Sequence, residues 1–567
     1  MKKLLFLLIA NCSLVTASLN AQQTKTFTHA DTLRGSITPE RAWWDVLRYD
    51  ITVKPDYENK TIEGTVKIIY KINGKSLNKL DMDKPMALMQ IDLQSPLVID
   101  KVQSTENNNF SIIHKQGENV WYINKGLTNY IQKKQLIDSI IITYHGKPRE
   151  AVRPPWDGGW IWKKDKQGRP WMSVACQGLG ASVWYPCKDH QSDEPDNGAS
   201  LTIIAPDTLA AVGNGRLSST IKNNDGTATW KWEVKNPINN YNIIPYIGKY
   251  VNWTDTLHGE KGVLDMSFWV LDYNLDSAKV QFQQAKSVIH ALEYWWGPYP
   301  FYEDSYKLVE SPHLGMEHQS AVGYGNRFRN GYLGSDLSGS GWGLKWDFII
   351  EHESSHEWFG NNITSKDLAD MWIHESFANY SETLYTEYLF GREAGNDYNY
   401  GTRKKIRNDE PIIAHYNVNE EGSGDMYYKG GNMLQTIRYS INNDAKWRSI
   451  LRGLGKTFYH QTVTAQQIEN YISKNAGIDF SKVFDQYLSN IQIPQLSYYY
   501  SPDKKKVYYR WDSCINGFNL QLVLLHDGKA IRIKPTQQWK SLNDTAFFNT
   551  AWIDKHYYIK LKEVKAE

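Results

Sequence analysis

Two histidines and two glutamates in the middle of the chain have the types and spacing of a metal-dependent hydrolytic site. The segment His352-Glu353-Ser354-Ser355-His356 has the pattern H-E-x-x-H, and Glu375 follows after eighteen intervening residues. The apolar residues before His352 predict a helix over residues 347–359, which places the two histidines one turn apart on one face. Both imidazoles can then bind one ion, with the Glu375 carboxylate as third ligand.

Glu353 is turned away from the ligand face but can still reach a water molecule beside the metal and act as general base. The five-residue pattern alone also arises by chance, and Glu375 alone would be an ordinary helix carboxylate. Glu382 lies seven residues after Glu375 on the same helical face, where it is a candidate hydrogen-bond partner of a ligand. The combined spacing therefore favours one Zn²⁺ per chain.

Three motifs resemble, in the same order, those of the M1 family of zinc aminopeptidases, the gluzincins that include aminopeptidase N and the leukotriene hydrolases. Besides the zinc motif, with Glu375 in a Trp-x-x-Glu-x-Phe-Ala context, Leu314-Gly315-Met316-Glu317-His318 resembles Gly-x-Met-Glu-Asn, and Tyr427-Tyr428-Lys429-Gly430 resembles Tyr-x-Lys-Gly. The resemblance implies that Glu317 binds the substrate's free amino terminus, beside Gly315 and Met316. It also implies that Tyr427 donates a hydrogen bond to the developing oxyanion, unless the motif is shifted by one residue to Tyr428.

The sequence departs from the family pattern near the predicted amine site. Leu314 and His318 replace the usual Gly and Asn, which bears more on binding of the peptide backbone than on the charge of Glu317. A second strand, beginning at Gln177, resembles the family's strand that brings a polar residue to the substrate's amino terminus. Counting forward along that strand places Leu179 at this position, whereas counting back from Pro186-Cys187 places Gln177 there. An amide can accept a hydrogen bond from an ammonium without adding a buried charge, so Gln177 is favoured.

The N-terminal residues and the composition indicate an exported protein. Residues 1–21 contain two lysines, a short apolar run and then small and polar residues, which is typical of a signal peptide and too short for a membrane span. The chain is therefore expected in the periplasm or outside the cell. The 64 basic and 62 acidic residues give no excess charge for binding nucleic acid. Cys176, Cys187 and Cys514 are expected to be buried thiols, with pairing of the first two left open.

A length of 567 residues requires several domains, and the pattern changes twice along the chain. Short alternating segments predict an all-β domain at residues 22–245, and helical periodicity dominates residues 246–493, including a helix at 277–296 that ends at Gly297-Pro298. Strand patterns return over residues 494–567, enough for a small β-sandwich. The fold class is multidomain α+β, and the resemblance implies a saddle-like N-terminal domain and a thermolysin-like catalytic domain.

Two segments have no assigned chemistry. The aromatic segment 152–160 is expected to be a covering flap, and the Gly- and Ser-rich segment 331–343, which lacks the ending of a phosphate-binding loop, is expected to be a mobile loop near the cleft.

Three functions compete. The favoured one is a zinc aminopeptidase acting on peptides with a free amino terminus. The second is a thermolysin-like endopeptidase, and the third is a catalytically silent binding or scaffold protein. Presence of His352, Glu353, His356, Glu375 and Tyr427 argues against the third. The sequence does not set the oligomeric state or the preferred first residue.

Overall fold

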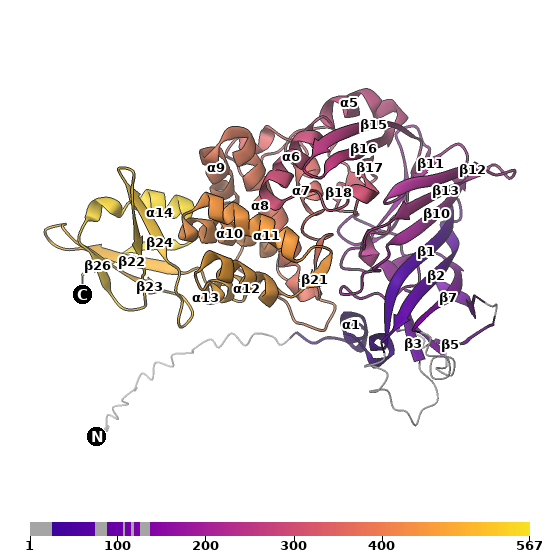
Figure 1. Ribbon diagram of the computed structural model, residues 1–567, viewed down its shortest axis with the longest axis horizontal. Coiled ribbons are helices and arrows are strands. Elements are labelled where there is room, and N and C mark those ends of the chain that lie inside the picture. The colour runs from indigo at the N-terminus through magenta and orange to yellow at the C-terminus, as the bar shows by residue number, and fades with distance from the viewer. Residues whose placement is uncertain (1–24, 74–87, 106–107, 115–117, 125–135, 567) are drawn as a thin grey trace, which may run out of the picture.

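The computed structural model of the chain describes residues 25–73, 88–105, 108–114, 118–124 and 136–566. The signal peptide predicted at residues 1–21 lies outside these ranges. Figure 1 shows the N-terminal strands at one end of the molecule, the helices in the middle and the C-terminal strands at the other end. This order of a β-rich region and a helical region confirms the predicted multidomain α+β fold. Every helix in the described ranges is too short or too polar to span a lipid bilayer.

The N-terminal region is built from three sheets. The largest has the strand order β12 (Arg216–Lys222), β13 (Thr227–Val234), β10 (Ala199–Pro206), β1 (Trp44–Asp56), β2 (Thr61–Ile72), β7 (Ile137–Gly146), β4 (Val98–Ser104). The second has the order β11 (Ala210–Val212), β14 (Tyr246–Gly248), β9 (Pro170–Ala175), β8 (Gly159–Lys164). The third has the order β3 (Leu88–Asp92), β6 (Val120–Asn124), β5 (Ser111–His114). Because β14 pairs with β9, this region continues a few residues past the boundary predicted at residue 245.

Alternation of apolar residues explains how β1 is placed in the largest sheet. Tyr49, Ile51 and Val53 point into the core and are buried, while the residues between them are more exposed. A shift of one residue would turn this apolar set toward solvent, so the pairing of β1 with β2 and β10 is strongly specified.

The middle region begins with a five-stranded sheet that has a short edge strand. Its order is β15 (Tyr250–Gly259), β16 (Gly262–Leu271), β17 (Tyr306–Glu310), β19 (Val322–Tyr324), β18 (Gly315–Met316). A further strand pair, β20 (Ile363–Ser365) and β21 (Gln461–Val463), joins distant segments. The helices are α5 (Leu275–Gln281), α6 (Gln284–Trp296), α7 (Phe348–Ser355), α8 (Trp372–Phe390), α9 (Arg392–Thr402), α10 (Tyr428–Ile441), α11 (Asp444–Thr457), α12 (Ala465–Ala476) and α13 (Ser481–Leu488).

Two predicted helices differ from the observed ones. The helix predicted at 277–296 is divided into α5 and α6 near Phe282, although it ends as expected at Gly297, which has φ of 95°. The helix predicted at 347–359 is α7, which ends at Ser355. His356 caps it and keeps helical angles (φ −64°, ψ −17°), so the two histidines still lie one turn apart.

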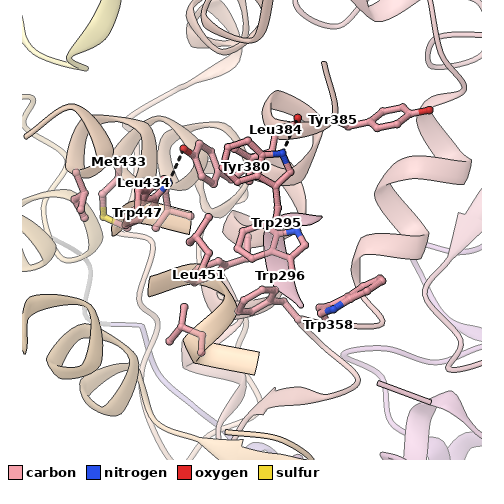
Figure 2. Packing of buried hydrophobic residues seen from close by; sticks show 14 of the residues in the cluster. Trp295, Trp296, Trp358, Tyr380, Leu384, Tyr385, Met433, Leu434, Trp447 and Leu451 are labelled. Atoms are coloured by element: carbon pink, nitrogen blue, oxygen red, sulfur yellow. Dashed lines mark hydrogen bonds between the residues drawn. The ribbon is translucent and has the colours of Figure 1, made fainter. Parts of the chain in front are cut away.

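A large aromatic and aliphatic core holds the helices of the middle region together. Figure 2 shows Trp295 and Trp296 of α6 packed near Tyr380 and Leu384 of α8 and Trp447 and Leu451 of α11. Two indole nitrogens have partners inside this core, with distances of 3.2 Å from Trp295 Nε1 to the Leu384 carbonyl and 3.1 Å from Trp447 Nε1 to the Tyr380 hydroxyl. The first hydrogen bond joins α6 to α8 and the second joins α11 to α8, so each one fixes a helix against its neighbour.

The C-terminal strands form two small sheets and share the hydrophobic core of the helices. A four-stranded sheet has the order β26 (Lys540–Leu542), β23 (Val507–Asp512), β22 (Gln495–Tyr500), β27 (Lys560–Glu563), and β24 (Leu522–His526) pairs with β25 (Lys529–Ile533). Helix α14 (Thr550–His556) completes this region. Buried residues of this C-terminal region, among them Trp511, Leu522 and Tyr557, belong to the same hydrophobic cluster as the preceding helices. The region therefore packs directly onto α10 and its neighbours.

The three cysteines in the described ranges are free thiols. Cys176 and Cys187 are buried, as expected, and do not form a disulfide with each other. Cys514 is half-buried and so departs from the expectation of full burial.

Candidate active site

Helix α7 is fixed at its start by Asp347. The Asp347 carboxylate accepts hydrogen bonds from the backbone nitrogens of Ile349 and Ile350 at 3.1 and 3.3 Å, which caps the helix. It also accepts from the Tyr324 hydroxyl at 2.8 Å and from Asn326 Nδ2 at 2.7 Å. One buried carboxylate thus ties the helix that carries His352 to strand β19.

The structure brings His352, His356 and Glu375 into one buried cluster. One potential ligand atom from each residue lies within 4.8 Å of the others. The Glu375 Oε2 atom is 3.8 Å from His352 Nε2 and 3.6 Å from His356 Nε2. Glu375 lies in the first turn of α8, so packing of α8 against α7 supplies the third group of the cluster.

Hydrogen bonds behind the histidines orient both rings. His352 Nδ1 lies 3.0 Å from Glu382 Oε1, and His356 Nδ1 lies 2.9 Å from the Phe359 carbonyl. Glu382 is itself held by Asn379 Nδ2 at 3.0 Å and the Tyr398 hydroxyl at 2.7 Å. An acceptor at Nδ1 places the hydrogen there and leaves the Nε2 lone pair directed at the cluster. Glu382 thus occupies the place behind a ligand that its spacing predicted.

The electrostatics of the cluster are those of a site for positive charge. Glu375 Oε2 is buried and has no hydrogen-bond partner among the described residues. Burial, followed by the charge of Glu317, raises the pKa of Glu375 well above its ordinary value. Burial lowers the pKa of His352, but Glu382, Glu353 and Glu375 outweigh it and raise that pKa to about 10, so without a metal ion the ring also carries a proton on Nε2, which a bound metal would displace. Several carboxylates therefore favour a cation at this place.

A cavity of about 490 Å³ opens onto the cluster. This volume lies in the range of small-molecule and peptide-end sites. Its walls come from segments far apart in the sequence, including Gln177, Glu317, Glu353, Tyr427 and Tyr428. No lysine or arginine is among the described residues that line it.

Glu353 faces this cavity and is not one of the three clustered groups. A Cβ atom added to Gly315 would lie 2.5 Å from Glu353 Oε1, so the carboxylate packs directly on the backbone of β18. Burial raises the pKa of Glu353 to about 8; the charge of His352 opposes this rise and that of Glu317 adds to it. The positive charge of a metal ion held by the neighbouring cluster would lower this pKa, which would leave the carboxylate free to accept a proton.

Glu317 lies directly after the edge strand β18 and is linked to the N-terminal region. Its Oε1 atom accepts hydrogen bonds from Gln177 Nε2 at 2.5 Å and from the Tyr241 hydroxyl at 3.1 Å. Gln177 lines the cavity, whereas Leu179 does not and instead packs beside Gly158. The prediction that a strand begins at Gln177 is wrong, because β9 ends at Ala175 and Gln177 lies in the turn that follows. The geometry favours Gln177 over Leu179 as the polar residue beside Glu317.

Leu314 and His318, the two residues that depart from the family motif, lie in different parts of the structure. Leu314 lines the cavity, together with Gly315 and Met316. His318 is buried behind the strand and hydrogen-bonds to the Tyr246 hydroxyl. Its substitution for Asn therefore changes the support of the strand more than the cavity wall.

Tyr427 precedes the first residue of α10 and lies against the ligand cluster. Its ring is nearly parallel to that of His352, with centroids 6.1 Å apart and an interplanar angle of 23°. Burial, followed by the negative charge of Glu375, raises the pKa of Tyr427 well above its ordinary value. The phenol is therefore protonated at neutral pH and can donate a hydrogen bond into the cavity. Tyr428 also lines the cavity.

Close packing of α10 on α8 explains the residues that follow Tyr427. Lys429 Nζ donates to the Asn490 carbonyl at 2.7 Å, which fixes the first turn of α10. A Cβ atom added to Gly430 would lie 1.8 Å from Ser376 Oγ, and Ser376 in turn donates to the Met426 carbonyl at 2.6 Å. Glycine at 430 thus permits the approach that positions Tyr427.

Gly430→Ala is expected to destabilise the protein by about 1–3 kcal/mol, the usual effect of adding a methyl group to a closely packed site. The measurement is the midpoint of thermal unfolding. Gly424→Ala serves as control, because the nearest atom to its added Cβ is the flexible Arg407 side chain at 3.2 Å. Equal midpoints for the two variants would show that Ser376 moves aside without cost.

Several cavity residues were not identified as functional from the sequence. Pro155 and Trp156 of the segment expected to be a covering flap line the cavity, and Trp156 is 72 % exposed. Tyr332 and Leu337, from the Gly- and Ser-rich segment, also line it. In the first segment, a tryptophan directly after two prolines was the available signal in the sequence. Glu421, which also lines the cavity, had no sequence signal.

The sequence matches two domains of one peptidase family. Residues 281–487 match the Peptidase family M1 domain, and residues 46–241 match the Peptidase M1 N-terminal domain. The two matches cover most of the chain and include the clustered histidines and glutamate. The chain belongs to peptidase family M1.

Individual relatives are distant. The chain is similar to probable aminopeptidase 2 of Sulfurisphaera tokodaii, with 22% identity over 79% of this chain and 54% of the relative. It is also similar to aminopeptidase N of Lactobacillus helveticus, with 23% identity over 80% of this chain and 52% of the relative. The chain thus spans about half the length of these curated relatives.

The fold is similar to that of a solved M1 zinc metallopeptidase from Deinococcus radiodurans, a mutant bound to a Tyr-Ser-Ala substrate. The TM-score is 0.63 at 18% identity, covering 79% of this chain and 95% of the other. At this identity the likeness establishes the fold.

Proposed function

We propose that this chain is a zinc-dependent aminopeptidase that removes the first residue from peptides with a free amino terminus. The observation that carries the proposal is the position of Glu317, hydrogen-bonded to Gln177, in the same cavity as the cluster of His352, His356 and Glu375. Membership in the M1 family supports it. The signal peptide predicted at residues 1–21 would place the activity in the periplasm or outside the cell.

The cluster fits a zinc ion. Two imidazole nitrogens and one carboxylate are a known ligand set for catalytic zinc, and such ligands, at about 2.0–2.2 Å from the metal, are about 3.3–3.6 Å apart. The distances of 3.8 and 3.6 Å from Glu375 Oε2 to the two histidines are close to this separation. When bound, zinc supplies Lewis acidity that polarises a peptide carbonyl and lowers the pKa of water. His352, His356 and Glu375 would hold it.

The chain's own residues have distinct tasks in the proposed reaction. Glu353 accepts a proton from the attacking water at its carboxylate and returns it to the leaving amine. Tyr427 donates its hydroxyl hydrogen to the carbonyl oxygen as negative charge develops there. Strand β18 is at the edge of its sheet, so Gly315 and Met316 can pair with the backbone of an extended peptide.

Glu317 favours removal of the first residue over cleavage within a chain. Its carboxylate is buried, and its hydrogen bonds with Gln177 and Tyr241 add no positive charge. A free α-ammonium supplies that charge and places the first peptide bond near the cluster. A peptide substrate that extended past Glu317 would have no ammonium at this position and would leave the negative charge of the Glu317 carboxylate uncompensated.

A panel of fluorogenic aminoacyl substrates, with and without a chelator, tests the proposal. Cleavage that is lost on chelation and restored by zinc is the expected result. Efficient cleavage within acetylated peptides would favour the endopeptidase, and a chain that binds no zinc and cleaves nothing would be the silent scaffold.

Glu317→Gln is expected to lower kcat/KM for free-amine substrates by about 10- to 100-fold, which corresponds to the free energy lost with one charge-assisted hydrogen bond. Acetylated peptides should be poor substrates of both the wild type and the variant, which provides the internal control. An unchanged kcat/KM for free-amine substrates would remove Glu317 from the amine site.

A further inference from the structure

Glu421 places an additional carboxylate in the cavity. It lies in the segment before the short helix η8 (Gly424–Met426), and its side chain is exposed to the cavity. A Cβ atom added to Gly178 would lie 2.0 Å from Glu421 Oε1, so the carboxylate sits directly on the Gly178 backbone. Gly178 follows Gln177, which donates to Glu317. Glu421 is therefore adjacent to the amine site.

The segment that carries Glu421 is held firmly. The Asn419 backbone nitrogen donates to the Asp31 carbonyl at 3.1 Å, in the helix α1 (His29–Gly35) that crosses from the N-terminal region. Glu420, the neighbour of Glu421, pairs with Lys25 and with His415 Nδ1, the latter at 2.7 Å. These contacts involve residues that do not line the cavity, and they hold the backbone just before Glu421.

Glu421 has no hydrogen-bond or ion-pair partner among the described residues. Among the described residues, no hydrogen-bond donor and no cation within 4.0 Å contacts its carboxylate, and no lysine or arginine lines the cavity. Arg34 is the cation whose charge acts on it, but Arg34 donates to the Gly178 carbonyl at 2.7 Å and lies 3.7 Å from Asp189. The other cavity carboxylates have partners or proposed tasks.

We propose that Glu421 selects peptides whose first residue has a basic side chain, lysine or arginine. The inference rests on the proposed aminopeptidase function. With the α-ammonium at Glu317, the first side chain begins beside Gln177 and Gly178, where Glu421 lies. A guanidinium or ammonium there gains a charge-assisted hydrogen bond from a carboxylate that forms no ion pair within 4.0 Å among the described residues. The exposed Trp156 ring lines the same cavity and offers a face on which a guanidinium can stack.

The test uses substrate pairs that differ in charge and little in shape. The kcat/KM ratios of arginine to citrulline and of lysine to norleucine substrates are measured for the wild type, Glu421→Gln and Glu410→Gln. Glu410 is an exposed residue of the same segment that does not line the cavity, so this control should keep the wild-type ratios. We expect wild-type ratios of roughly 10 to 100, which corresponds to the free-energy contribution of a hydrogen bond to a charged group. In Glu421→Gln the ratios should be near unity.

A second variant keeps the proposal testable if the first one folds poorly. Glu421→Lys should reverse the preference, so that a glutamate substrate is cleaved better than a glutamine substrate. Wild-type ratios near unity, with ordinary cleavage of neutral substrates, would overturn the proposal and leave the aminopeptidase function intact. An equal loss for charged and neutral substrates in Glu421→Gln would also overturn it, because Glu421 would then bind the α-ammonium. No cleavage of any substrate would reject the proposed function itself.

Discussion

Glu353→Gln is expected to lower kcat by about 10²- to 10⁴-fold, the usual contribution of a general base. The amide keeps the shape of the side chain against Gly315 but cannot accept the proton. Glu353 is not one of the three clustered groups, so the variant should still bind close to one zinc ion per chain. The measurements are turnover of an aminoacyl substrate and metal content after dialysis.

His352→Ala provides the contrast for this experiment. It removes a proposed ligand, so zinc and activity should be lost together. If Glu353→Gln also lost its zinc, Glu353 would be a ligand and the assignment as base would be wrong.

Tyr427→Phe is expected to lower kcat by about two to three powers of ten, the effect of removing one donor to a developing oxyanion. Because the donor acts mainly in the transition state, KM should change much less than kcat. Phenylalanine retains the ring that lies 6.1 Å from the His352 ring, so the variant removes the hydroxyl without opening a cavity. Steady-state kinetics on one substrate give both constants.

Tyr428→Phe is the matched control, because Tyr428 lines the same cavity one residue later. Its kcat should stay near that of the wild type. The reverse outcome, with the larger loss in Tyr428→Phe, would shift the assignment of the Tyr-x-Lys-Gly motif by one residue.

The alternative functions make different demands on the same cavity. An endopeptidase needs room for chain on both sides of the cluster, but Glu317, Gln177 and Tyr241 together place a buried carboxylate at one end of it. A scaffold has no need for the hydrogen bonds that direct both histidine Nε2 atoms at one point. The aminopeptidase accounts for both features.

Local periodicity allowed the sequence by itself to predict that His352 and His356 lie together. In a helix, residues four apart share a face, so H-E-x-x-H predicts two converging imidazoles without knowledge of the fold. The seven-residue step from Glu375 to Glu382 likewise predicts a carboxylate behind a ligand, and Glu382 lies 3.0 Å from His352 Nδ1. Alternating strands and a glycine helix stop were predictable for the same reason, because they depend on neighbours in the chain.

Only the tertiary structure decided what surrounds the cluster. Whether Gln177 or Leu179 reaches Glu317 depends on how β9 and the following loop meet β18, which no local pattern specifies. Trp156 lies about 200 residues before the H-E-x-x-H motif in the sequence, and Glu421 lies about 65 residues after it, yet both line the cavity. Their positions result from long-range packing, such as that of α1 on the segment before Glu421. Spacing in the sequence carries no information on such contacts, because the groups share neither a helix nor a strand.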